Sequence, residues 1–191
     1  MDAAPPRRAR NAAGDILDAA HRVVARDGAG RLTLDAVARE VGMTKGGVLY
    51  NFPSKTALLA AMLTRMLERF EVEAAEAAVA AAAAGHSAPT LRGMLEAVEK
   101  LDNDHPQLHL AIVAAGAEDP AALAPLRAMA ARLQARILDE TADGPGAMLA
   151  CAAADGLIFQ RLMDMPPADP ALRAAVRARI LAIADALEPR A

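Results

Sequence analysis

The chain has 191 residues, of which 54% are hydrophobic and only 2% aromatic, with a single cysteine and a formal net charge of −3. This length allows one or two compact units with a sizeable core, and one cysteine excludes an intrachain disulfide and suits a reducing cytoplasm. No apolar run reaches the roughly 18 residues of a membrane span and the N-terminal segment lacks the apolar stretch of a secretory signal, so we expect a soluble cytoplasmic protein.

The composition predicts an all-α fold, because alanine, the best helix former, supplies much of the apolar fraction. Few stretches combine β-branched and aromatic residues at a period of two, so no strand is predicted. Residues 1–65 carry ten Lys or Arg and six Asp or Glu, whereas residues 66–191 carry eleven and eighteen. Residues 1–65 are therefore basic and the rest of the chain is acidic, which favours contact with nucleic acid through residues 1–65. Such an asymmetry also arises by chance.

The first predicted elements form a helix-turn-helix. Apolar residues at helical spacing from Ile16 predict a helix that ends at Asp27-Gly28. In the stretch LDAVAREVGMTKGGVLYNFPS that follows, two short helical patterns flank Gly42, which can adopt the positive φ that a tight turn requires. Thr33 is placed to cap the first of these helices and Thr44 the second. In this motif the second helix lies in the major groove of DNA.

The remaining elements predict a helical second domain. Ser54 caps a long connecting helix over about residues 54–84, and further helices open at Pro89, Pro106 and Asp119. Gly144-Pro145-Gly146 breaks the pattern, and two last helices follow over about residues 147–163 and 169–187. We therefore expect about nine helices, with a three-helix domain that carries the helix-turn-helix over residues 1–53 and a second, helical-bundle domain over residues 54–191.

The segment from Ala9 to Leu67 resembles the tetracycline-repressor (TetR) family of bacterial regulators. The resemblance rests on TLDAVAREVG, TKGG and FPSKTALL, which occur in order and at the family's spacing. The family's usual tyrosine is replaced here by Leu49, and Tyr50 follows it. The sequence is similar to the branch that reads GGLLYHF, with Asn51 at the position of the histidine.

The resemblance implies a regulator that binds DNA through the second helix of the motif. Lys45 and Tyr50 are long enough to reach bases or phosphates, and Lys55 matches the family's phosphate-binding lysine. Gly46 and Gly47 have no side chains and therefore permit close approach of the backbone to DNA, although the need for a turn alone also explains them. For Lys55 the alternative is an ordinary exposed lysine. An N-terminal arginine arm either reaches the DNA or is merely solvated. The predicted DNA-binding residues are Arg10, Thr33, Thr44, Lys45, Gly46, Gly47, Tyr50, Asn51 and Lys55.

The resemblance further implies a homodimer through the last two helices and a small-molecule effector among the middle ones. A mostly apolar effector is expected, because methionines adapt to irregular ligands and few polar groups are available. The same methionines also suit plain core packing. The predicted ligand-binding residues are Met94, Val98, His109, Val113, Met129, Leu133, Phe159 and Met163.

No metal or cofactor is predicted. His105 and His109 lie four residues apart near two aspartates, but they lack the fixed ligand set of a dedicated site. Cys151 is interpreted as a small buried hydrophobe. The sequence holds no glycine-rich phosphate loop, GxSxG or HExxH motif, so an enzyme is not predicted and a small-molecule carrier or enzyme is a remote alternative. The predicted function is a repressor that a small effector releases from a palindromic operator, and a DNA-binding regulator without an effector is the alternative.

Overall fold

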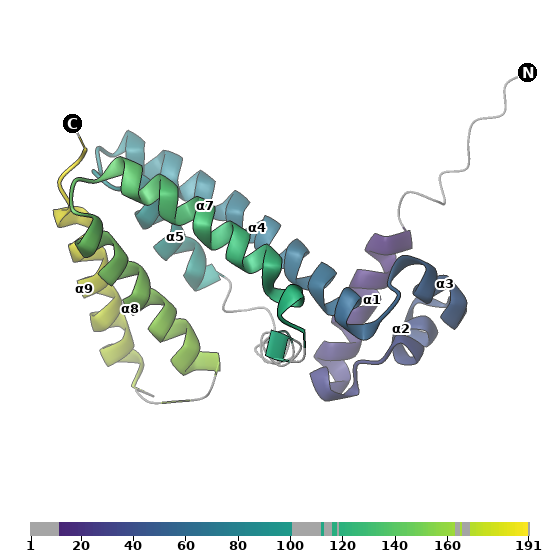
Figure 1. Cartoon of the computed structure of the whole chain (residues 1–191). Helices are drawn as coiled ribbons and strands as arrows, with labels where there is room; N and C mark the ends of the chain where they lie inside the picture. The colour runs from purple at the N-terminus through teal and green to yellow at the C-terminus, as the bar shows by residue number, and fades with distance from the viewer. Residues whose placement is uncertain are drawn as a thin grey trace, which may run out of the picture. The chain divides into compact units, whose positions relative to one another are not determined.

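The computed structural model describes residues 12–100, 112, 116–117, 119–162, 165 and 169–190. These residues form eight α-helices and two 3₁₀ turns, so the predicted all-α fold is confirmed (Figure 1). Within this part of the chain, no helix combines the length and the apolarity that crossing a membrane requires. The elements are α1 (Ala12–Asp27), η1 (Ala29–Arg31), α2 (Leu34–Val41), α3 (Lys45–Asn51), α4 (Lys55–Ala83), α5 (Pro89–Lys100), η3 (Pro120–Leu123), α7 (Ala124–Glu140), α8 (Gly144–Leu162) and α9 (Pro170–Ala186).

The chain forms two compact units. The first comprises Met1–Thr64 and Gln107–Ala124, and the second comprises Arg65–Pro106 and Pro125–Ala191. Helix α4 contributes its first turns to one unit and the rest to the other.

The core of the first unit joins α1, α2, α3 and the start of α4. Each of these helices fully buries at least one apolar side chain, and Leu32 joins them from the segment after η1. These side chains recur at helical spacing, so each helix buries one stripe and leaves the other face to solvent. The fully buried residues include Ile16, Val23, Leu32, Val37, Val48, Leu58, Met62 and Leu63.

The core of the second unit consists largely of small side chains, which let helices approach closely. At Gly93 in α5, an added Cβ would overlap the carbonyl oxygen of Ala74 and lie 2.6 Å from the backbone nitrogen of Ala78, both in α4. Helices α8 and α9 lie side by side (Figure 1) and share the main cluster with α5. That cluster comprises Ala88, Leu91, Leu95, Ile137, Ala147, Ala150, Cys151, Ala154, Ile180, Ala184 and Leu187.

Two predicted boundaries in the second half of the chain are wrong. Gly144-Pro145-Gly146 does not break the helical pattern but forms the first turn of α8, where the Asp143 carboxylate accepts a hydrogen bond from the Gly146 nitrogen at 2.9 Å. Proline fits a first helical turn because the nitrogens there have no helical partner. The element after Asp119 is also not one helix, since η3 precedes α7.

Candidate nucleic-acid interface and ligand pocket

The geometry of α2 and α3 is set by short-range signals in the sequence. The Thr33 hydroxyl accepts a hydrogen bond from the Ala36 nitrogen and the Thr44 hydroxyl accepts one from the Gly47 nitrogen, each at 3.1 Å, so both predicted caps are confirmed. Gly42 has a φ of 72°, which a side chain would disfavour, and this turns the chain between the helices. Val48 is fully buried, so α3 presents its opposite face outward.

The outward face of α3 exposes one aromatic and one apolar side chain. Tyr50 is 91% exposed and Leu49 is 36% exposed. Both side chains are available for contact with a partner of α3, and burying them on binding would be favourable. Gly46 is exposed as well, and a Cβ there would meet only the Thr44 hydroxyl at 3.9 Å, so its backbone is accessible. The sequence prediction did not include Leu49, although its helical position next to Tyr50 pointed to this face.

Besides the two capping threonines, two more of the predicted DNA-binding side chains have partners within the chain. The Lys45 ammonium lies 2.9 Å from the Asp35 carboxylate, with both side chains more than half exposed. The Asn51 amide donates a hydrogen bond to the Gly47 carbonyl at 2.9 Å, so this side chain folds back along α3. Lys55 is exposed at the first residue of α4, after the Ser54 hydroxyl accepts a bond from the Ala57 nitrogen at 3.0 Å. Arg10 lies outside the described residues, and its role stays a prediction.

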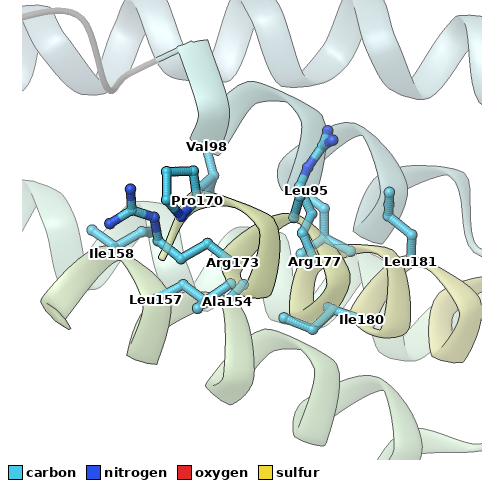
Figure 2. A pocket seen from close by; sticks show the side chains of 11 residues that line it. Leu95, Val98, Ala154, Leu157, Ile158, Pro170, Arg173, Arg177, Ile180 and Leu181 are labelled. Atoms are coloured by element: carbon cyan, nitrogen blue, oxygen red, sulfur yellow. The ribbon is translucent and has the colours of Figure 1, made fainter. Parts of the chain in front are cut away.

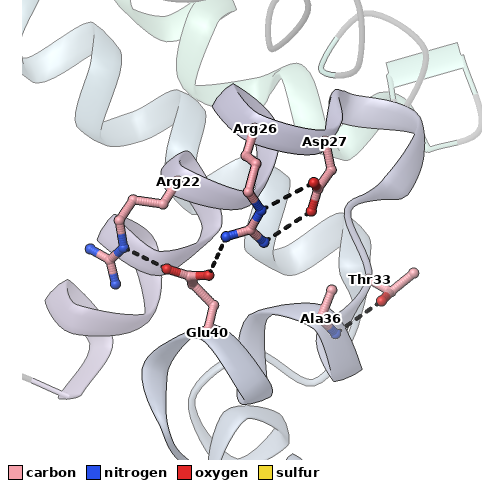
Figure 3. Close-up of polar contacts among 6 residues, drawn as sticks. All are labelled: Arg22, Arg26, Asp27, Thr33, Ala36 and Glu40. Carbon is pink, nitrogen blue, oxygen red and sulfur yellow. Dashed lines mark hydrogen bonds and ion pairs between the residues drawn. The ribbon is translucent and has the colours of Figure 1, made fainter.

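An ion-pair network braces α1 against α2 (Figure 3). Arg22 and Arg26 both donate to the Glu40 carboxylate, at 2.8 Å and 2.7 Å, and Arg26 also pairs with Asp27 at 2.9 Å. Hydrogen bonds from Arg26 and then Arg22 hold the pKa of Glu40 below its usual value, and the bond from Arg26 does the same for Asp27. Arg22 and Arg26, two of the positive charges of the first unit, therefore already pair with carboxylates of the same unit. Sequence spacing did not reveal this network, because Glu40 is far from both arginines along the chain.

The second unit contains a pocket of about 420 Å³ between α5, α8 and α9 (Figure 2). Its wall is apolar except for two arginines of α9, which the sequence prediction missed. Arg173 and Arg177 are four residues apart, and this spacing could have predicted that both lie on the same face of a helix. The lining residues are Leu95, Val98, Ala154, Leu157, Ile158, Pro170, Arg173, Ala174, Arg177, Ile180 and Leu181.

Among the predicted ligand-binding residues that the structure describes, only Val98 lines this pocket. Met94 packs on the core cluster, Met129 and Leu133 are buried on α7, and Phe159 is 53% exposed. The predicted residues outside the described part of the chain are His109, Val113 and Met163.

Metal-ligating and redox-active groups do not define a site in the described part of the chain. No cluster of three or more His, Cys, Asp or Glu side chains with metal-binding geometry occurs there, and His105 and His109 lie outside it. Cys151 is buried in α8, and burial raises the pKa of its thiol to about 11. Since the thiolate is the reactive form, this cysteine is expected to be inert near neutral pH.

Two family models match the chain. Residues 16–62 match the model described as bacterial regulatory proteins of the tetR family, and residues 88–185 match the tetracyclin repressor-like C-terminal domain. The first match runs from Ile16 in α1 into the first two turns of α4, and the second runs from just before α5 into α9. No curated protein matches the chain in sequence.

Several solved structures share the fold. A TetR transcription regulator from Haloarcula marismortui is 21% identical with a TM-score of 0.69, covering 94% of this chain and 99% of that one. A transcriptional regulator from Rhodococcus sp. Rha1 is 19% identical with a TM-score of 0.68, covering 92% and 97%. The multidrug binding protein EbrR, complexed with imidazole, is 25% identical with a TM-score of 0.62, covering 94% and 96%. EbrR is also known complexed with malachite green.

Proposed function

Because the chain belongs to the TetR family of transcriptional regulators, we propose that it binds a palindromic operator as a homodimer and that a small molecule releases it. The observation that carries the DNA-binding proposal is the outward face of α3, where Tyr50 and Leu49 are exposed on a helix capped by Thr44. Each α3 would enter a major groove, with the two helices about 34 Å apart on the operator. Tyr50 would reach a phosphate or base edge, and Leu49 would contact a thymine methyl group.

Dimerisation is proposed through α8 and α9. Leu149 and Phe159 of α8 and Leu172 of α9 are 63%, 53% and 49% exposed, and Ala152 lies exposed between the first two. Surface apolar residues gathered on two adjacent helices support an interface between copies of the chain. Ile180 of α9 and Leu187 just after it do not belong to this surface, because both are buried within the second unit.

Effector binding is proposed in the pocket of the second unit. The complexes of EbrR with two small molecules support this use of the fold, and about 420 Å³ is in the usual range for a small-molecule site. An effector would act by shifting the tilt of α4, with Pro53 and the Ser54 cap as the hinge. A coupling of about 1–3 kcal/mol would lower operator affinity roughly 5- to 150-fold.

The proposal is tested by DNA binding. The purified full-length protein is expected to prefer the promoter region of its own gene over random DNA of equal length by a large factor, since specific sites are bound about 10³- to 10⁷-fold tighter than non-specific DNA. The measurement is a fluorescence-anisotropy titration at fixed salt. Equal affinity for both DNAs would contradict the proposal. Strong preference that no small molecule alters would favour a regulator without an effector.

Lys55→Ala is expected to weaken binding to every DNA sequence. Lys55 is exposed at the start of α4, where its ammonium would neutralise a phosphate, so its loss removes a sequence-independent contact. The slope of log affinity against log salt should fall by about one for each half-site. Lys100→Ala is the matched control, because Lys100 is an exposed lysine at the end of α5. A variant of Lys55 with the wild-type slope would exclude the phosphate contact.

A further inference from the structure

The pocket of the second unit combines an apolar wall with positive charge. Arg173 and Arg177 lie one turn apart on α9, and Figure 2 shows both among the apolar side chains of the wall. The described lining contains no acidic side chain. Two like charges beside an apolar surface oppose the entry of a cation and favour the entry of an anion.

The placement of the two arginines differs. Arg173 is exposed, whereas Arg177 is half-buried and its Nε atom is fully buried. Positive charge therefore extends from solvent into the wall of the pocket, while leucines, isoleucines and Val98 form the rest. Each arginine also makes a further interaction within the chain. A guanidinium has five donors, so it can hold such a partner and still donate to a ligand.

We propose that this pocket binds an amphipathic anion, a carboxylate with an apolar body, and that Arg173 and Arg177 set this preference. The carboxylate would accept hydrogen bonds from the guanidinium groups, whose planar donors match its two oxygens. The apolar body would lie against Leu95, Val98 and Leu157. This inference rests on the proposed effector site and names the chemical class of its ligand.

A pocket with this preference should bind cationic ligands poorly. Malachite green, which EbrR binds, is a cation, and the two arginines would repel such a molecule. A neutral molecule with the same apolar body would fill the pocket but leave the guanidinium groups without the added charge-assisted bonds. Ligands that share an apolar body but differ in head-group charge should therefore bind with different affinities to a pocket that prefers anions and with similar affinities to a purely apolar pocket.

The test compares three ligands with the same alkyl chain: decanoate, decan-1-ol and decyltrimethylammonium. Titration calorimetry of the full-length protein is expected to give at least about tenfold tighter binding of decanoate than of the other two, the size of one charge-assisted hydrogen bond. Arg173→Gln and Arg177→Gln should each reduce this preference. Arg136→Gln, an exposed arginine on α7 outside the pocket lining, should retain it.

Three outcomes would overturn the inference. They are equal binding of the three ligands, tighter binding of the cation, and no binding of any of them. A preference for decanoate that both glutamine variants retain would also overturn it, because the charge would then come from elsewhere. Thermal unfolding of each variant checks that the fold is intact.

Operator affinity, measured separately, distinguishes this inference from the proposed function. If decanoate binds through the arginines without changing operator affinity, the ligand class stands and the effector role fails. If only a neutral or cationic ligand binds and releases DNA, the effector role stands and the anion preference fails.

Discussion

Gly156→Arg is expected to give a folded monomer that no longer binds its operator tightly. Gly156 lies on α8 between Ala152 and Phe159, and a Cβ there would meet no atom within 4 Å in the chain itself. The arginine therefore fits the isolated chain. In the proposed dimer it would be a buried charge without a partner, which costs about 3–5 kcal/mol, or roughly two to four powers of ten in the dimer dissociation constant.

Sedimentation velocity at micromolar concentration measures this effect, and anisotropy titration measures the loss of operator affinity. Gly156→Ala is the matched control, because its methyl group adds no charge and alanine favours a helix. A Gly156→Arg protein as dimeric as the wild type would refute the proposed interface. Retention of the thermal stability of the second unit shows that the change acts on assembly and not on folding.

Gly93→Ala is expected to destabilise the second unit strongly, although only one methyl group is added. The new Cβ would overlap the Ala74 carbonyl oxygen and approach the Ala78 nitrogen, and both are backbone atoms of α4 that cannot rotate away. Helices α4 and α5 would have to separate along their contact. Overpacking of this kind costs up to about 3 kcal/mol, which lowers the melting temperature by about 6–12 °C for a chain of this size.

Circular dichroism at increasing temperature measures the melting point. Gly30→Ala is the matched control, since an added Cβ there would meet nothing within 4 Å and the residue does not have a positive φ. The control should unfold at the wild-type temperature or slightly above it. An unchanged melting point for Gly93→Ala would show that α4 and α5 do not cross as closely as described.

The elements that could be predicted from the sequence are those specified by neighbouring residues. The caps at Thr33, Thr44 and Ser54 depend on one side chain and an amide three residues later, and each was predicted correctly. Gly42 is a similar case, because positive φ is a property of a single residue. The first turn of α8 was missed because proline both interrupts and opens helices. The hydrogen bond that the Asp143 carboxylate accepts from the Gly146 nitrogen shows that a helix opens here.

The pocket could not be predicted, because it does not depend on residues that are neighbours in the sequence. Its wall is assembled from three helices that are far apart in the sequence, and helical periodicity gives the buried stripe of a helix but not its partner. Met129 and Leu133 have the expected apolar periodicity, yet they are buried on α7 and do not line the pocket. No arginine was among the predicted ligand-binding residues, although a long charged side chain can lie along an apolar wall.

The ion pairs of the first unit affect how this regulator would search a chromosome. A chromosome offers about 10⁶–10⁹ competing sites, and affinity for them grows with each cation given to phosphate. Lys45 is held by Asp35, and Arg22 and Arg26 are held by Glu40, so a random sequence would have to compete with these carboxylates for each cation. Breaking an exposed pair such as Lys45–Asp35 costs up to about 1 kcal/mol, which weakens a phosphate contact with a random sequence and is offset at a site that also offers base contacts. Residence on incorrect sequences is therefore expected to be short, which leaves more of the protein for its operator.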